Sequence, residues 1–264
     1  MIVKHGAHVY GLAVTIKKRG KEVKRIIDEV DKEVSDVYFI NYHPIPDNKF
    51  KLIMYFNVKE PSIVYRIVKR ITEYDFVNEV KTIEPKVPGL LIDTESFPLR
   101  MGSEQRAIVF GDIIYRGLLG ESRKKFGGTA EAFLFYLGLF SGEEAAKSDM
   151  KLASRLDIHD PLTVFMVISI PLMKALGYCN MKVIELKPRE TSIVRVYDSF
   201  ECEIGKPSDK PFSHFLRGFI AGLFSGLFKG KYIIRETKCI AKGDPYCEFI
   251  ITRVPSLRTE IPLP

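Results

Sequence analysis

The chain has 264 residues, of which 46% are apolar, and its 40 Lys and Arg exceed its 33 Asp and Glu by seven. This length accommodates one large domain or two ordinary ones, and the apolar fraction suffices for a hydrophobic core. No apolar run is long enough to span a bilayer, the first ten residues lack the apolar segment of a signal peptide, and four cysteines are too few for a secreted disulfide framework. We therefore expect a cytoplasmic protein, and the modest basic excess permits an anionic partner without requiring one.

Residues 8–84 alternate between strand-like and helix-like patterns. One helix is expected after Gly20 and a second begins at Pro61, because apolar residues recur on one face of each segment. The strand-like stretches are 8–17, 36–43, 49–58 and 77–85. The order β-α-β-β-α-β predicts a ferredoxin-like α+β domain, with both helices on one face of an antiparallel sheet. With a glycine at its first strand–helix turn, this domain resembles the ACT-type regulatory domains.

A proline-rich stretch, residues 85–98, separates this half of the chain from the next. It contains Pro85, Pro88 and Pro98, and proline-rich segments commonly connect domains. We therefore expect a first domain at 1–84, a linker at 85–98 and a second domain at 99–264.

The second half combines long apolar helices with short strands. Asp160 followed by Pro161 is a typical helix start, with a capping carboxylate and proline at the first helical position. The expected helices are 111–127, 128–155, 159–178 and 212–230, and the expected strands are 180–188, 191–201, 231–241 and 246–254. This pattern predicts a mixed α/β domain, so the whole chain is expected to be an α+β protein.

Four sequence blocks of the second half resemble the 4-vinyl-reductase domain family in the order in which they occur. They are GTAEAFLFYLGLFSG from residue 128, DSFE from residue 198, HFLRGFIAGLFSGLFKG from residue 214, and ETKC with CEF in the last hairpin. The resemblance implies a fold related to the TRAPP subunits and the haem-nitric-oxide-binding sensors. Family members act mostly as small-molecule sensors. The reductase chemistry in the family name has no support, because the sequence has no Gly-rich nucleotide fingerprint and no cysteine set for an iron–sulfur cluster.

The last hairpin carries a candidate metal site. The phenol-sensing relatives hold zinc with a glutamate and three cysteines, and the resemblance places three of these ligands at Glu236, Cys239 and Cys247. The fourth position falls at Ser213, and serine is a poor zinc ligand, so Cys202 is the candidate to complete the site. Three interpretations stay open: a structural zinc site, a disulfide across the hairpin, and buried free thiols.

Two apolar helices supply the candidate ligand-binding residues. Residues 133–140 place aromatic side chains all round their helix, which is therefore expected to be buried. The helix at 212–230 carries a glycine every fourth position, which permits close approach of another backbone, and this stripe either packs tightly on the sheet or walls an apolar ligand chamber. The candidate chamber residues are Phe133, Tyr136, Leu137, Phe140, Phe219 and Gly222.

The expected function is that of a non-enzymatic sensor for a small, mostly apolar molecule. The resemblance places Val196 where the phenol-sensing relatives hold phenol with a tryptophan, and the chain has no tryptophan, so a ligand other than phenol is expected. Occupancy would shift the arrangement of the two domains or of a homodimer. The alternatives are an enzyme acting on a hydrophobic substrate in the same cavity and a DNA-binding regulator. No cluster of titratable residues supports the enzyme. No nucleic-acid-binding motif accompanies the short basic stretches 17–25 and 121–128, which are therefore interpreted as solvent-exposed surface.

Overall fold

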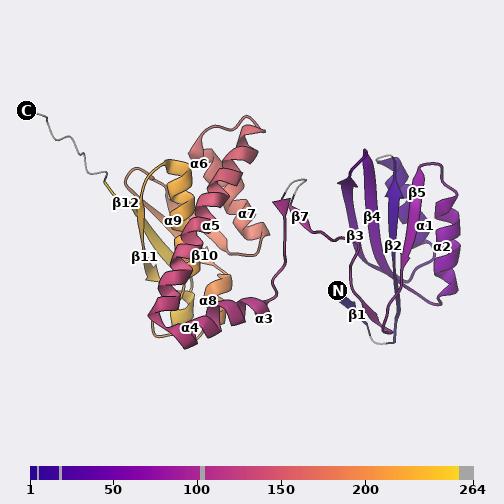
Figure 1. The fold of residues 1–264 in the computed structure, drawn as a ribbon, viewed down its shortest axis with the longest axis horizontal. Helices are drawn as coiled ribbons and strands as arrows, with labels where there is room; N and C mark the ends of the chain where they lie inside the picture. The colour runs from indigo at the N-terminus through magenta and orange to yellow at the C-terminus, as the bar shows by residue number, and fades with distance from the viewer. Residues whose placement is uncertain (5, 18–19, 102–104, 256–264) are drawn as a thin grey trace, which may run out of the picture. The chain divides into compact units, whose positions relative to one another are not determined.

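The computed structural model describes residues 1–4, 6–17, 20–101 and 105–255 (Figure 1). The chain divides into two compact units, Met1–Val109 and Phe110–Pro264. Each unit combines helices with an antiparallel sheet, so the predicted α+β fold class is confirmed. Among the described residues, no helix is both long enough and apolar enough to cross a membrane.

The first unit has the ferredoxin-like topology that its sequence predicts. Its main elements are β2 (His8–Ile16), α1 (Lys21–Asp31), β3 (Asp36–Ile45), β4 (Lys49–Val58), α2 (Ser62–Thr72) and β5 (Val77–Ile83). The strands form one antiparallel sheet in the order β3-β4-β2-β5, and Figure 1 shows both helices on the same side of it. Each helix buries one apolar face against the sheet, where Ile26, Leu52 and Ile67 lie in the core.

The stretch expected to be a linker packs on the face of this sheet that the helices leave open. Strand β6 (Leu90–Leu91) pairs with β1 (Ile2–Val3), and Leu91 is buried against the sheet. Beyond it, the Tyr55 hydroxyl donates a hydrogen bond of 2.5 Å to the carboxylate of Asp93. The short strands β7 (Arg100–Met101) and β8 (Gln105–Arg106) follow. The boundary between the compact units therefore falls after Val109, because the residues that follow Pro85 have partners on the sheet.

The second unit combines a four-stranded antiparallel sheet with two long helices. The strands are β9 (Asn180–Glu185), β10 (Thr191–Tyr197), β11 (Tyr232–Lys238) and β12 (Cys247–Arg253), in the order β11-β12-β10-β9. The long helices are α5 (Gly128–Ser154) and α9 (His214–Phe228). The shorter helices are α3 (Asp112–Tyr115), α4 (Ser122–Phe126), α6 (Pro161–Val164), α7 (Ile170–Ala175) and α8 (Phe200–Ile204). Two π-helical turns, Arg116–Glu121 and Phe165–Ser169, lie between α3 and α4 and between α6 and α7.

Helices α5 and α9 cross in direct backbone contact. Gly138 and Gly142 of α5 face Gly218 and Gly222 of α9. A Cβ atom on Gly222 would lie 1.9 Å from the carbonyl oxygen of Leu139, and a Cβ atom on Gly138 would lie 2.0 Å from the carbonyl oxygen of Phe215. No side chain fits between the helices at this contact. The glycine stripe therefore permits the expected close approach of another backbone, but its partner at Gly218 and Gly222 is helix α5 and not the sheet.

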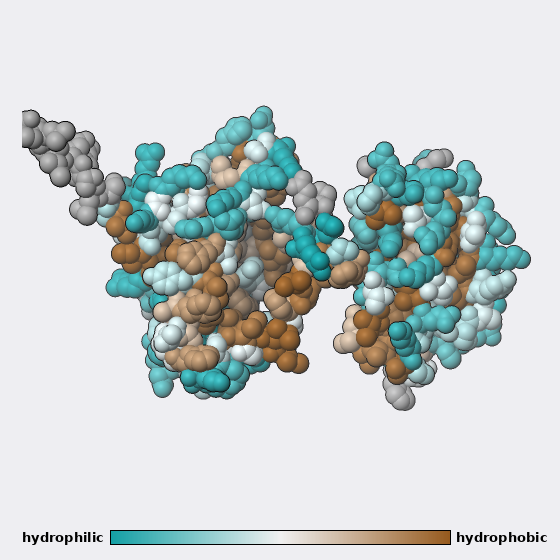
Figure 2. Space-filling view, viewed as in Figure 1, coloured by the Kyte–Doolittle hydropathy of each residue, from teal (hydrophilic) through white to brown (hydrophobic). Residues whose placement is uncertain are grey.

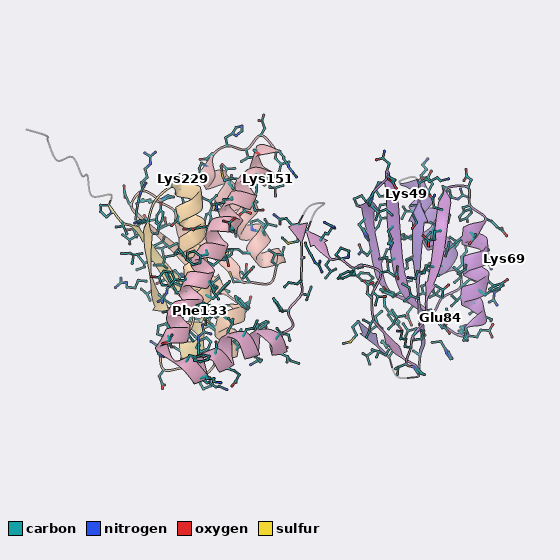
Figure 3. The ribbon with its side chains drawn as sticks, viewed as in Figure 1. Lys49, Lys69, Glu84, Phe133, Lys151 and Lys229 are labelled. Atoms are coloured by element: carbon teal, nitrogen blue, oxygen red, sulfur yellow. The ribbon has the colours of Figure 1, made fainter. Side chains whose placement is uncertain are left out.

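The side of α5 that faces away from α9 is apolar and exposed. The exposed fractions of Phe133, Tyr136 and Phe140 are 61%, 55% and 58%, and Figure 3 labels Phe133 on this helix. The prediction that the helix is buried on all sides is wrong, because the glycine contact covers only one narrow face. Ile113 and Leu118 are exposed as well. Figure 2 shows apolar surface on the second unit in brown.

Candidate functional site

Three cysteines and one glutamate converge inside the second unit. Cys202 comes from α8, Glu236 from β11, Cys239 from the residue that follows β11, and Cys247 from the start of β12. One ligand atom from each lies within 4.8 Å of all the others, and the three cysteines are fully buried. The Sγ atom of Cys202 lies 3.6 Å from that of Cys239 and 3.5 Å from that of Cys247.

These sulfur–sulfur distances fit a metal site rather than a covalent bond. A disulfide holds its sulfurs about 2.05 Å apart, whereas sulfurs bound tetrahedrally to zinc at about 2.3 Å lie about 3.8 Å from one another. All four cysteines of the chain are free thiols in the structure. Three sulfurs and one carboxylate form a donor set that suits zinc.

The last hairpin positions two of these thiols through its backbone. Between the strands, Gly243 adopts a positive φ of 97°, and the carboxylate of Asp244 accepts a hydrogen bond of 2.8 Å from the backbone N–H of Cys239. The backbone N–H of Ile240 points at the sulfur of Cys247 at 3.3 Å. The backbone N–H of Phe212 points at the sulfur of Cys239 at 3.4 Å. Such N–H groups favour thiolates, which are the forms that bind metals.

Ser213, at the position of the relatives' fourth ligand, lies beside the cluster. Its hydroxyl donates a hydrogen bond of 2.8 Å to Glu236 and lies 2.9 Å from the sulfur of Cys202. Cys202 is held there because Ser199 caps α8, with its Oγ accepting a hydrogen bond from the backbone N–H of Cys202 at 3.3 Å. The serine hydroxyl thus orients Glu236, and Cys202 supplies the third sulfur.

The charge distribution of the cluster also fits a bound cation. The Oε2 atom of Glu236 is buried and has no hydrogen-bond partner among the described residues. Burial raises the pKa of Glu236 to about 8. Hydrogen bonding from Cys202 holds the pKa of Cys239 well below its usual range, and the same contact raises the pKa of Cys202. A divalent cation would satisfy the orphaned carboxylate oxygen and stabilise the thiolates.

A surface hollow of about 640 Å³ lies near the cluster in the same unit. Helix α5 contributes Glu131, Phe135 and Tyr136 to its lining, helix α9 contributes His214 and Arg217, and β11 contributes three residues from Tyr232 onward. The guanidinium of Arg217 lies 5.5 Å from the centre of the Phe135 ring. Burial, followed by the charge of Arg123, lowers the pKa of His214 to about 4, so its imidazole is neutral at physiological pH. The hollow therefore offers aromatic surface and a few polar groups.

A comparison with protein families matches part of the second unit. Residues 192–253 match the family model of the 4-vinyl-reductase domain. The chain carries a 4-vinyl-reductase domain. The matched region contains all four residues of the Cys/Glu cluster, so the cluster is part of the 4-vinyl-reductase domain itself.

Solved structures resemble both units. The phenol-responsive sensory domain of the transcription activator PoxR, with phenol, has a TM-score of 0.51 and 19% identity, covering 57% of this chain and 78% of its own. This match shows that the 4-vinyl-reductase domain shares the fold of that sensory domain. A vinyl-4-reductase family protein of Methanocaldococcus jannaschii has a TM-score of 0.39 and 15% identity, covering 58% of this chain and 85% of its own. The ACT domain of a GTP pyrophosphokinase of Chlorobium tepidum has a TM-score of 0.26 and 13% identity, covering 29% of this chain and 97% of its own. No curated protein matches the chain.

The structure does not gather the expected ligand-binding residues of the second unit around one cavity. Tyr136 lines the surface hollow. Phe133, Leu137 and Phe140 lie on the exposed side of α5, outside that lining. Val196 and Phe219 are buried in the core of the second unit, and Gly222 lies in the helix–helix contact.

A buried ion pair near the cluster was not foreseen from the sequence. The guanidinium of Arg123 bonds to the carboxylate of Glu201, and both side chains are buried. Glu201 also accepts hydrogen bonds of 2.9 and 2.8 Å from the backbone N–H groups of Phe215 and Leu216, in the first turn of α9. Burial raises the pKa of Glu201, while Arg123 and the two N–H groups act in the opposite direction. Arg123 belongs to the basic stretch 121–128, which was predicted to be exposed to solvent. Glu201 is the last residue of the DSFE block, so this block was the feature of the sequence that could have pointed to the ion pair.

Proposed function

We propose that the 4-vinyl-reductase domain of this protein is a non-enzymatic sensor of a small, mostly apolar molecule. The observation that carries the proposal is the match to the family model, together with the fold shared with the phenol-responsive sensory domain of PoxR. The hollow between α5, α9 and β11 is the proposed ligand site, because its aromatic side chains and few polar groups suit such a ligand. The tryptophan expected for holding phenol is absent, which supports a different ligand.

A chain of polar contacts connects the proposed ligand site with the interior of the second unit. Glu131, in the hollow, lies 3.6 Å from the imidazole of His214. The other side of that imidazole lies 3.4 Å from Arg123, which holds Glu201 at the start of α9. A ligand that contacts Glu131 or His214 would change the surroundings of the Arg123–Glu201 pair. Cys202, the next residue, belongs to the metal cluster, so occupancy would act on α8 and α9 together.

We propose that the Cys/Glu cluster of the second unit holds zinc in a structural role. The orphaned Oε2 atom of Glu236 supports a cation here, and the three sulfurs support zinc in particular. Bound zinc would tie α8, β11 and β12 to one another. The four protein ligands would complete a tetrahedral shell, which leaves no position for a substrate.

We propose that two copies of the chain associate through the exposed apolar side of α5. Phe133, Leu137 and Phe140 form a continuous row along this helix, and large exposed apolar patches are typical of interfaces. A homodimer joined by α5 would place two ligand-binding units side by side, so that ligand occupancy could change their relative arrangement. Sedimentation of wild-type protein and Phe140→Glu tests this: we expect a dimer that the charge converts to a monomer. A wild-type monomer would remove this part of the proposal.

The ligand site can be tested with 1-anilinonaphthalene, a neutral apolar dye whose fluorescence rises in apolar sites. We expect it to bind the full-length protein, and Tyr136→Ala, in the hollow, to weaken binding. Leu137→Ala is the matched control, because Leu137 is the next residue, is also exposed, and lies outside the lining of the hollow. Equal losses in both variants would place the dye on the exposed side of α5 and contradict the proposed site. Native mass spectrometry of unheated protein would report a retained ligand and the bound metal together.

A further inference from the structure

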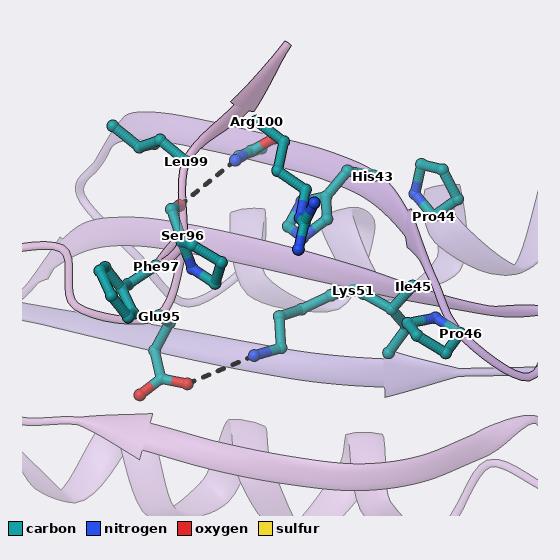
Figure 4. A pocket seen from close by; sticks show the side chains of 12 residues that line it. His43, Pro44, Ile45, Pro46, Lys51, Glu95, Ser96, Phe97, Leu99 and Arg100 are labelled. Carbon is teal, nitrogen blue, oxygen red and sulfur yellow. Dashed lines mark hydrogen bonds and ion pairs between the residues drawn. The ribbon is translucent and has the colours of Figure 1, made fainter. Parts of the chain in front are cut away.

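The open face of the first unit's sheet carries a cavity that the proposed sensor function does not use. Strands β3 and β4 form its base, and residues 95–100 cross over it (Figure 4). Its volume of about 940 Å³ lies in the range of small-molecule sites. All of its lining residues belong to the first unit, so the cavity does not depend on the second unit.

Three basic side chains line this cavity. His43 of β3 and Lys51 of β4 are register partners across the sheet, and Figure 4 shows Arg100 reaching into the same opening. The Nδ1 atom of His43 is buried and has no partner among the described residues. The backbone of Arg100 pairs with Arg106, but its guanidinium has no hydrogen bond or ion pair to another of the described residues. The guanidinium of Arg100 and the Nδ1 atom of His43 are therefore available to a ligand.

The one carboxylate in the lining, Glu95, pairs more closely with a lysine outside the lining than with Lys51. Its Oε1 atom lies 2.5 Å from the ammonium of Lys81, which is not part of the lining, and its Oε2 atom lies 3.5 Å from the ammonium of Lys51. The hydrogen bond from Lys81 holds the pKa of Glu95 below its usual value, so the group is ionised. The charges of Lys51 and Arg100, set against that of Glu95, give the lining a single net positive charge.

The remaining lining is apolar. Ile45 comes from the end of β3, and Phe97 and Leu99 come from the segment that crosses over the sheet. Phe97 and Leu99 are exposed, and the guanidinium of Arg106 lies 5.2 Å from the centre of the Phe97 ring. Apolar surface beside a net positive charge is the arrangement that an amphipathic anion needs.

We propose that this cavity binds a small organic monoanion, with its carboxylate on Arg100, Lys51 and His43 and its apolar body against Ile45, Phe97 and Leu99. A planar guanidinium pairs with a carboxylate through two parallel hydrogen bonds, which fixes the orientation of the ligand. A dianionic phosphate fits less well, because its second charge exceeds the single positive charge by which Lys51 and Arg100 outnumber Glu95 in the lining. The first unit would then bind a charged compound, in addition to the apolar ligand of the proposed sensor unit.

The test uses phenylacetate as the probe with the full-length protein. The imidazole resonance of His43 is assigned by its loss in His43→Gln and followed by NMR during the titration. Phenylacetamide is the neutral control of nearly equal shape, and phenyl phosphate is the dianionic one. We expect phenylacetate to shift the His43 resonance saturably, with a dissociation constant at least tenfold lower than those of the other two compounds.

Matched variants then separate this site from general charge attraction. Arg100→Gln is expected to weaken phenylacetate binding at least tenfold. Lys49→Gln is expected to leave it unchanged, because Lys49 lies on the same strand as Lys51 but outside the lining. Circular dichroism confirms that both variants are folded. The proposal is overturned if phenylacetate does not perturb His43, if the amide or the phosphate binds at least as well, or if Lys49→Gln has the same effect as Arg100→Gln.

Discussion

The contact between α5 and α9 makes a strong prediction for Gly222→Ala. The added Cβ would lie 1.9 Å from the carbonyl oxygen of Leu139, whereas carbon and oxygen atoms in close contact lie about 3.3 Å apart. The helices would therefore have to separate by more than about 1 Å at this point. That shift would also loosen the contacts of Gly138, Gly142 and Gly218, which are equally close.

The magnitude follows from two opposing effects. Overpacking typically costs about 1–3 kcal/mol, and the upper end applies here because a backbone carbonyl cannot move aside as a flexible side chain can. Alanine returns up to about 1 kcal/mol through its higher helix propensity. We therefore expect Gly222→Ala to lower the free energy of unfolding of the second unit by about 2 kcal/mol, which corresponds to a change of about thirtyfold in its folding equilibrium.

Gly128→Ala is the matched control. A Cβ on Gly128, in the first turn of α5, would meet no atom within 4 Å, so this substitution should be neutral or stabilising. Because the chain has two compact units, hydrogen exchange followed by mass spectrometry is the suitable assay: peptides of the first unit serve as an internal reference. If Gly222→Ala exchanges in α5 and α9 no faster than Gly128→Ala, the close contact is not a constraint on stability.

Three further predictions concern other parts of the chain. Elemental analysis should find about one zinc per chain, which Cys247→Ser should abolish. Cys179→Ser, which removes a buried thiol outside the cluster, should retain the zinc. Equal zinc contents in the wild type and both variants would exclude the site. Burial raises the pKa of Asp149, so the folded state holds this proton more tightly than the unfolded state, and stability falls as pH rises through the folded-state pKa. Asp149→Asn should therefore stabilise the second unit at about pH 7 and lose this advantage toward about pH 4; a gain independent of pH would contradict the assignment to Asp149. Chymotrypsin should first cleave at the exposed Phe110 rather than within 85–98, because the latter segment packs on the sheet; early cleavage there would mean that it detaches in solution.

The first unit could be predicted well because its signals are local. The apolar faces of α1 and α2 and the strands between them set the order of elements, and that order permits few arrangements of four strands. The segment after Pro85 was misjudged for a reason that is not local. Its prolines mark a break in secondary structure, but only the folded sheet reveals that Leu91 and Asp93 have partners on the open face.

The second unit shows the same limit at its candidate site. The spacing of Glu236, Cys239 and Cys247 indicated a cluster. Ser213 stood at the position of the fourth ligand, which was therefore missing. Cys202 was the candidate for the missing fourth ligand. Its position could not be predicted from the sequence, because the packing of α8 against the last hairpin places its sulfur 3.6 Å from that of Cys239. The aromatic residues of α5 were misread, because periodicity shows that a helix is apolar and cannot show which neighbour covers it.

The cluster takes its ligands from positions far apart in the chain, and this has a consequence for biosynthesis. Cys202 leaves the ribosome well before Glu236 and Cys239, and Cys247 follows after both. Because binding energy at such a site is folding energy, a growing chain that lacks β12 would hold the ion only weakly. With zinc bound as proposed, metal uptake would thus wait until β12 has been synthesised. The ratio of metal to protein in a purified sample would then measure the fraction of molecules whose second unit has been completed correctly.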